Sequence, residues 1–91
     1  MSLIDNEISI NLQLIDELGY KDTLNLSVTQ VARIIGVSTP TVEAWRKRGF
    51  IEAIKVGNRV LYPKLKIAEF QARKNLDLLE EAIEDSNAKK T

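Results

Sequence analysis

Cysteine and histidine are both absent from this 91-residue chain. Without cysteine there can be no disulfide framework and no thiolate metal site, and the redox compartment is left open. Without histidine the commonest general base and metal ligand is missing. No nucleophile-elbow, P-loop or zinc motif takes their place. The sequence therefore predicts a protein that is not an enzyme and that uses no cofactor or metal ion.

Long hydrophobic runs are also absent, because no apolar stretch approaches the roughly 18 residues that a membrane span needs. Residues 1–18 carry acids where a signal peptide would carry cations. With 44% hydrophobic and 29% charged residues, the composition is typical of a soluble globular chain. We therefore expect a single small domain over residues 1–91, with a marginal core, in the cytoplasm and away from membranes.

The formal net charge of zero conceals a segregation of charge along the chain. Residues 1–26 hold five acids and one cation, a net −4. Residues 27–67 hold eight cations and two acids, a net +6, and residues 68–91 hold four cations and six acids, a net −2. Phosphate groups respond to such a local field rather than to the charge of the whole chain, so the middle block is the candidate for contacts with nucleic acid.

Within this basic block, residues 28–48 have the pattern of helix, tight turn, helix. Gly36 supplies the turn, because glycine takes a positive φ without steric cost. Ser38 or Thr39 can cap the second helix, Pro40 fits its first turn, and Gly49 ends it. The apolar residues Val31, Ala32, Ile35, Val37, Val42 and Trp45 are spaced as in a helix-turn-helix motif. Trp45 could offer a base a stacking surface, but its position favours a place in the core.

Polar and basic residues remain on the other face of the second helix. Its start carries short hydroxyl side chains and its end carries cations, as expected for a helix that reads base edges and contacts phosphates in a major groove. Residues 54–62, centred on Gly57-Asn58, read as a β-hairpin, or wing, with an inner Tyr62. The predicted DNA-binding residues are Ser38, Thr39, Thr41, Glu43, Arg46, Lys47, Arg48, Lys55, Asn58 and Arg59.

Residues 26–70 resemble the winged-helix domain of excisionase-type and MerR-type DNA-binding proteins. The resemblance rests on the helix-turn-helix with Trp45, then Arg48-Gly49-Phe50-Ile51, the Val56-Gly57 turn, Tyr62, Ile67 and Phe70. One departure is that Leu65 and Lys66 stand where the family usually has a polar or acidic N-cap, so Pro63 is expected to begin the last helix instead. The resemblance implies a mainly α fold with a small β-hairpin wing.

Two flanking segments complete the predicted architecture. Residues 3–18 fit two patterns. Apolar residues alternate with polar ones, as in a strand, at Ile8, Ile10, Leu12 and Leu14. A helix would instead place on one face Ile4, Ile8, Leu12, Ile15 and Leu18. The acids at the start and Gly19 at the end favour a helix. After a linker over residues 20–25, Leu24 and Leu26 are expected to pack as the chain enters the motif.

The C-terminal segment is predicted as a helix over residues 64–85 with a flexible tail over 87–91. Its apolar residues Leu65, Ala72, Leu76, Leu79 and Ile83 recur at spacings of seven, four, three and four, and the last four match a short seam of heptad type. The seam could lie on the N-terminal helix of the same chain or on a second chain. The acids Glu80, Glu81, Glu84 and Asp85 are most simply a solvated helix face rather than a metal site.

Together these features predict a sequence-specific double-stranded DNA-binding protein, associated with the nucleoid when bound. One small domain reads few base pairs, so a homodimer or a cooperative array is expected. The resemblance implies one of two roles. The first is an excisionase-like recombination directionality factor, with a recombinase or another DNA-bound protein as partner. The second is a small transcriptional regulator of a mobile element. A DNA-recognition subunit of a phage packaging complex is a third role. The alternative from another class is a protein-interaction module that binds an acidic partner through the basic face.

Overall fold

The computed structural model describes the backbone of residues 2–89 and the side chains of residues 2–78. The helices are α1 (Leu3–Ile15), the π-helical turn η1 (Asp16–Tyr20), α2 (Val28–Ile35), α3 (Thr39–Lys47) and α4 (Lys64–Lys89). The strands are β1 (Asn25–Leu26), β2 (Ile54–Val56) and β3 (Arg59–Pro63). This mainly helical chain with a small antiparallel sheet has the fold class expected of a winged helix-turn-helix. No helix over residues 2–89 is long and apolar enough to cross a bilayer.

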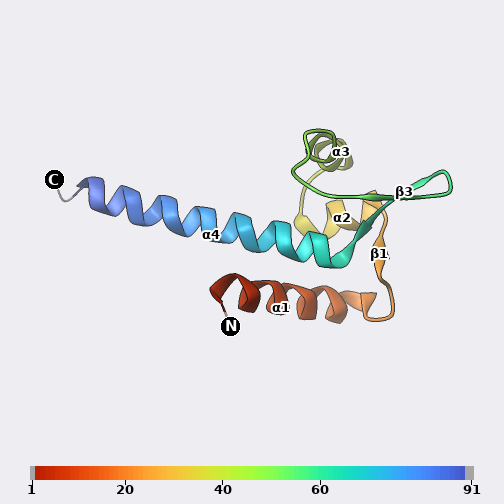
Figure 1. Ribbon diagram of the computed structural model, residues 1–91, viewed down its shortest axis with the longest axis horizontal. Coiled ribbons are helices and arrows are strands. Elements are labelled where there is room, and N and C mark those ends of the chain that lie inside the picture. The colour runs from red at the N-terminus through yellow and green to blue at the C-terminus, as the bar shows by residue number, and fades with distance from the viewer. Residues whose placement is uncertain (1, 90–91) are drawn as a thin grey trace.

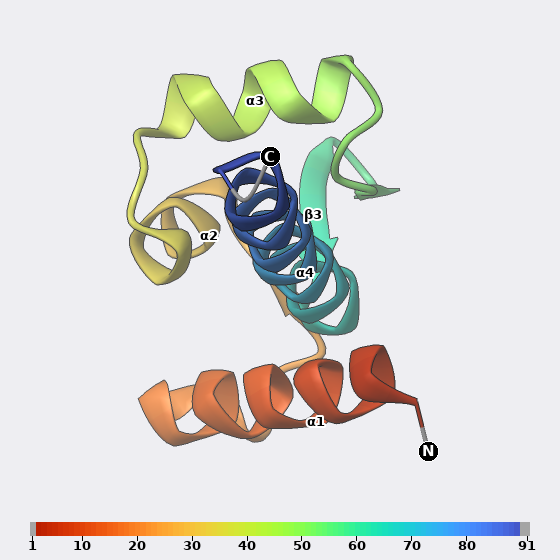
Figure 2. The same cartoon turned by 90° about the vertical axis from the view of Figure 1, so that its left-hand side faces the viewer.

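Helix α4 runs through the middle of the molecule, with α1 on one side and α2 and α3 on the other (Figures 1 and 2). Helix α1 lies antiparallel to α4, as three polar contacts show. Asn11 Nδ2 donates to the Ala68 carbonyl at 3.1 Å, Asn75 Nδ2 donates to Glu7 at 3.4 Å, and Lys64 Nζ lies 2.6 Å from Asp16 Oδ1. In the described part of α4, the seam that begins at Ala72, which is fully buried, is therefore covered from within the chain.

The helical interpretation of residues 3–18 is correct, and the strand alternative is wrong. Ser2 caps α1 by accepting a hydrogen bond from the Asp5 N–H at 3.3 Å, and Asp5 places an acid in the first turn. Ile15 is buried on the expected face, but Leu18 is 64% exposed. The helix breaks directly after Leu18, at Gly19, whose φ is 108°.

Strand β1 is a feature that the sequence pattern did not predict. Asn25 pairs with Pro63 and Leu26 pairs with Tyr62, so part of the expected linker joins a three-stranded sheet of order β1-β3-β2. Leu26 is fully buried by this pairing, but Leu24, which was expected to pack, is 78% exposed. Leu24 lies in the bend before β1, outside the strand whose alternation would place it on the same side as Leu26, and its carbonyl accepts from the Lys64 N–H at 2.9 Å.

The predicted turns and wing are present. Ser27 and Gln30 form a capping box at the start of α2, and Gly36 ends that helix with a φ of 91°. In the wing, Lys55 pairs with Val60 and Val56 pairs with Arg59. Of the two turn residues only Gly57 takes a positive φ, at 62°, as in a type II′ hairpin turn.

Helix α4 begins at Lys64, as predicted, directly after Pro63, which is the last residue of β3. Its other end differs from the prediction. The helix continues past residue 85 to Lys89, because no glycine or proline follows Pro63, so residues 87–89 are helical rather than a tail. Leu65 is 46% exposed and so lies off the covered seam. The side chains of Leu79, Ile83 and the acids at 80–85, and all of residues 90–91, lie outside the described residues.

The core lies where α1, the helix-turn-helix and the sheet meet α4. Its buried side chains include those of Ile15, Leu26, Val31, Ala32, Val42, Ile51, Tyr62, Ile67, Ala68 and Phe70. Trp45 packs at the edge of this core with its ring centroid 5.2 Å from that of Phe70. The predicted structural roles of Trp45 and Tyr62 are therefore confirmed, and α3 is fixed to the rest of the domain by one face.

Candidate nucleic-acid interface

Helix α3 is held by its apolar side and leaves a polar side open. Val42 is fully buried and Trp45 is half-buried, whereas Glu43, Lys47 and Arg48 are exposed. The helix lies on the outer side of the molecule, across α4 from α1 (Figure 2). A second helix presented in this way by a helix-turn-helix can enter a major groove of DNA.

The hydroxyl groups at the start of α3 interact with each other. Ser38 occupies the N-cap position, but its side chain makes no hydrogen bond to the backbone of the first turn. Its Oγ instead lies 2.8 Å from Thr41 Oγ1. Thr39 is half-buried at the next position. Each hydroxyl has a proton and two lone pairs, so the Ser38–Thr41 pair keeps capacity for a base edge or a phosphate and is already oriented.

Arg46 differs from its neighbours Lys47 and Arg48, because it is half-buried and its Nε is enclosed without a hydrogen-bond acceptor among the described residues. It lines a groove of about 460 Å³ between the end of α3 and the wing. Lys55 of β2 lines the same groove. Arg46 and Lys55 therefore both line this groove, whereas Lys47 and Arg48 do not.

The wing presents the remaining predicted residues to solvent. Lys55, Asn58 and Arg59 are all exposed, and Asn58 lies in the turn between β2 and β3. Val56, which pairs with Arg59, is also 54% exposed. The tip therefore has a cation that suits contact with a sugar–phosphate backbone, beside an exposed apolar side chain.

Ion pairing separates the cations of the basic block into two groups. Lys64 is paired with Asp16, while the Lys66 ammonium lies 3.3 Å from Glu52 and 3.5 Å from Glu69. The side-chain hydrogen bond to Glu52 and the charge of Glu69 raise the pKa of Lys66 above its usual value. Within residues 2–78, no ion pair engages the five predicted cations. These are Arg46, Lys47, Arg48, Lys55 and Arg59.

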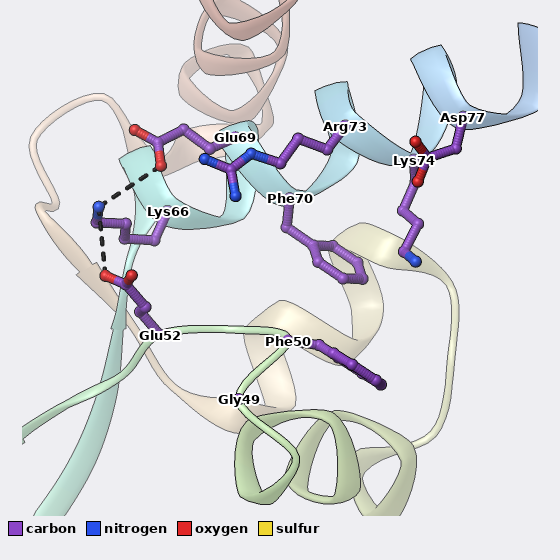
Figure 3. A pocket seen from close by; sticks show the side chains of 9 residues that line it. All are labelled: Gly49, Phe50, Glu52, Lys66, Glu69, Phe70, Arg73, Lys74 and Asp77. Atoms are coloured by element: carbon purple, nitrogen blue, oxygen red, sulfur yellow. Dashed lines mark ion pairs between the residues drawn. The ribbon is translucent and has the colours of Figure 1, made fainter. Parts of the chain in front are cut away.

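A second groove, of about 300 Å³, lies between the segment after α3 and the first turns of α4 (Figure 3). Phe50 is 57% exposed there, and the Lys74 ammonium lies 5.9 Å from the Phe50 ring centroid and 5.8 Å from that of Phe70. Arg73 and Lys74 were not predicted as site residues. Their adjacency was visible in the sequence, but nothing in it indicated that α4 would bring them beside the end of α3.

Metal binding finds no support in the described part of the chain, where no three acidic side chains lie close enough to hold an ion. The predicted cations lie at the end of α3 and on the wing. Such side chains can bind an anion by charge and hydrogen bonds.

Comparison with known proteins agrees with this geometry. A family model described as "Helix-turn-helix domain" matches residues 26–75, which is more than half of the chain and includes α2, α3, the wing and the first turns of α4. Neither a curated protein nor a solved structure matches the chain. The matched segment coincides with the elements that carry the unpaired cations.

Proposed function

This chain belongs to the helix-turn-helix domain family, and from that premise we propose that it is a sequence-specific double-stranded DNA-binding protein. Helix α3 enters the major groove, where Thr41 and Glu43 are the candidate base readers. A hydroxyl can serve several bases, and a carboxylate can accept from the amino group of cytosine. Lys47 and Arg48 then lie at the end of the helix, where they meet phosphates.

The observation that carries this proposal is the distribution of unpaired charge. The cations of α3 and the wing are unengaged within residues 2–78, whereas Lys64 and Lys66, which belong to the same basic stretch, are neutralised by carboxylates. The acidic helix α1 lies on the opposite side of α4 (Figure 2). A duplex approaching α3 would therefore meet cations and be kept from the acids.

The groove between α3 and the wing is the proposed seat of the sugar–phosphate backbone. Arg46 and Lys55 line it, and the enclosed Arg46 Nε has no acceptor in the described chain. Because the Nε itself is enclosed, the part of the Arg46 side chain that lines the groove would be the part that meets a phosphate oxygen. Arg59, at the wing, would hold the flanking backbone or the minor groove.

Its proposed biological role is that of an excisionase-like recombination directionality factor or a small transcriptional regulator of a mobile element, in the cytoplasm and on the nucleoid. We propose a dimer or cooperative array as the binding species, because one such domain reads only a few base pairs. Helix α4 extends beyond the end of α1 (Figure 1), and Leu78, the last residue whose side chain the structure describes, is 64% exposed. That extension, rather than the buried Ala72, is the surface on which a second copy could dock.

The test separates base reading from backbone contact by residue. Replacing Thr41 or Glu43 with Ala should relax the preference at particular base pairs, by about 1–3 kcal/mol for each lost base contact. Replacing Arg59 with Ala should weaken binding to all sequences alike, because a phosphate contact carries no base information. Affinities of the three variants for a panel of single-base variants of a bound site measure both effects. Unchanged selectivity in both α3 variants would remove this helix as the reader.

The alternative is a protein-interaction module whose basic face binds an acidic partner. Exposed apolar residues of the wing, Ile54 at 42% and Val56 at 54%, favour it. A module of this kind would show no steep, salt-sensitive affinity for random DNA, which is the property that distinguishes the two functions.

A further inference from the structure

An apolar groove lies between the end of α1, α2 and the beginning of α4. Its volume is about 530 Å³, and its walls include Leu14, Leu18, Ile34, Ile35 and Ile67. Leu14 is 54% exposed and Leu18 is 64% exposed, although both are large apolar side chains. The groove takes no part in the proposed contacts with DNA.

Helix α1 extends this apolar surface toward its own N-terminus. Leu3 is 59% exposed and Ile10 is 52% exposed. Spacings of seven and four residues place Leu3, Ile10 and Leu14 on one face of the helix. The opposite face, with Ile8, Leu12 and Ile15, packs on the core of the same chain. Helix α1 therefore has two apolar faces, of which the described residues cover one, and large exposed apolar patches typically mark interaction sites.

The charges around the groove indicate what can cover it. From Leu3 to Tyr20 the chain has four acids and neither lysine nor arginine. Asp16 is paired with Lys64, but Glu17 lines the groove itself. If a second copy placed its α1 here, two acidic helices would meet, and close like charges are unfavourable. A helix with an apolar face flanked by lysine or arginine has the complementary chemistry.

We propose that this groove is a docking site for a basic amphipathic helix of another protein. Apolar side chains of that helix at positions i, i+3 or i+4, and i+7 would fill the space between Leu14, Leu18 and Ile34, as in other helix-in-groove complexes. Its cations would face Glu17, which lines the groove. Helix α1 and α3 lie on opposite sides of α4 (Figure 2), so the docked helix and a DNA duplex occupy separate surfaces. The protein would then join a second protein to its DNA site.

The experiment uses the full chain and two synthetic probes. One is a fluorescein-labelled leucine–lysine peptide with leucines at helical spacing, and the other is a leucine–glutamate peptide with the same leucine pattern. Fluorescence anisotropy is measured in the absence of DNA, because the basic peptide would itself bind DNA. We expect saturable binding of the basic peptide and at least about tenfold weaker binding of the acidic one.

Two variants locate the binding. The double variant Leu14→Ser/Leu18→Ser should weaken binding of the basic peptide at least about tenfold, while the matched variant Leu24→Ser, which changes a leucine that is 78% exposed and does not line the groove, should leave it unchanged. Circular dichroism checks that the variants fold. The double variant should retain affinity for DNA, so failure of this docking site and failure of DNA binding are separate results.

Three results would overturn the proposal. Equal binding of the two peptides would show that charge does not select the occupant. Unchanged binding by the double variant, which keeps every charge, would show that the peptide is held elsewhere. A concentration-dependent dimer, seen by sedimentation of the wild-type chain and lost in the double variant, would identify a second copy as the occupant.

Discussion

The most quantitative consequence of the proposed interface is the salt dependence of DNA binding. Five cations of α3 and the wing have no ion pair within residues 2–78, namely Arg46, Lys47, Arg48, Lys55 and Arg59. If each contacts one phosphate, the logarithm of the binding constant should fall with the logarithm of salt concentration with a slope of about −4.5, at about 0.9 per contact. Affinity should then drop about 500-fold between about 50 mM and 200 mM salt.

Removing one of these cations tests the number of phosphate contacts. Arg59→Ala should make the slope shallower by about 0.9, so that the same change in salt lowers affinity only about 150-fold. Lys66→Met is the matched control, because the Lys66 ammonium already lies 3.3 Å from Glu52 and 3.5 Å from Glu69. Methionine keeps the apolar stem of the side chain while removing the charge, and the slope should not change.

The assay is a titration of a labelled duplex at four or five salt concentrations, for the wild-type chain and both variants. If Arg59→Ala lowers affinity equally at every concentration, the lost contact is not an ionic contact with phosphate. If Lys66→Met changes the slope as much as Arg59→Ala does, ion pairing within the chain does not decide which cations meet DNA, and the reasoning fails.

Three predictions concern stability and can be measured by urea unfolding. Leu26→Ala should lower the free energy of unfolding by about 2–5 kcal/mol, because Leu26 is fully buried. Leu24→Ala, at a side chain that is 78% exposed, should change it by no more than about 0.5 kcal/mol. Equal effects would contradict the placement of β1. Gly36→Ala should cost about 1–2 kcal/mol through its φ of 91° alone, since a Cβ there meets nothing within 4 Å; a neutral effect would refute the left-handed turn. Lys64→Met should cost about 1–3 kcal/mol, because its ammonium donates at 2.6 Å to Asp16; an unchanged midpoint would show that the pair adds nothing.

Local patterns in the sequence were enough to predict the helix-turn-helix and the wing. Gly36, Pro40 and Gly57 act through their own backbone preferences, and the apolar spacing around Val42 and Trp45 follows from helix geometry. The same holds for α1, whose Ser2 cap and Asp5 lie within its first turn. For these elements, the local structure could be inferred from near neighbours, although the exposure of Leu18 at the end of α1 could not.

Features that depend on distant pairing could not be predicted in this way. Strand β1 has two residues and exists only because Leu26 pairs with Tyr62, far along the chain. Leu24 and Leu26 look alike in the sequence, and only that pairing decides which one is buried. In the candidate site, the fold also decides that Arg46 is half-buried beside the wing and that Lys74 lies near Phe50, since both depend on how separate elements pack.

The measurement that tests the central claim most directly is a selection from random duplex DNA, followed by a gel shift on the winning sequence at two salt concentrations. The proposed function predicts an enriched motif whose binding weakens steeply at the higher salt. Two spaced inverted half-sites would indicate a symmetric dimer, and a direct repeat would indicate a head-to-tail array. No enrichment, together with no salt-sensitive binding to any duplex, would contradict the DNA-binding account and leave the protein-interaction function in its place.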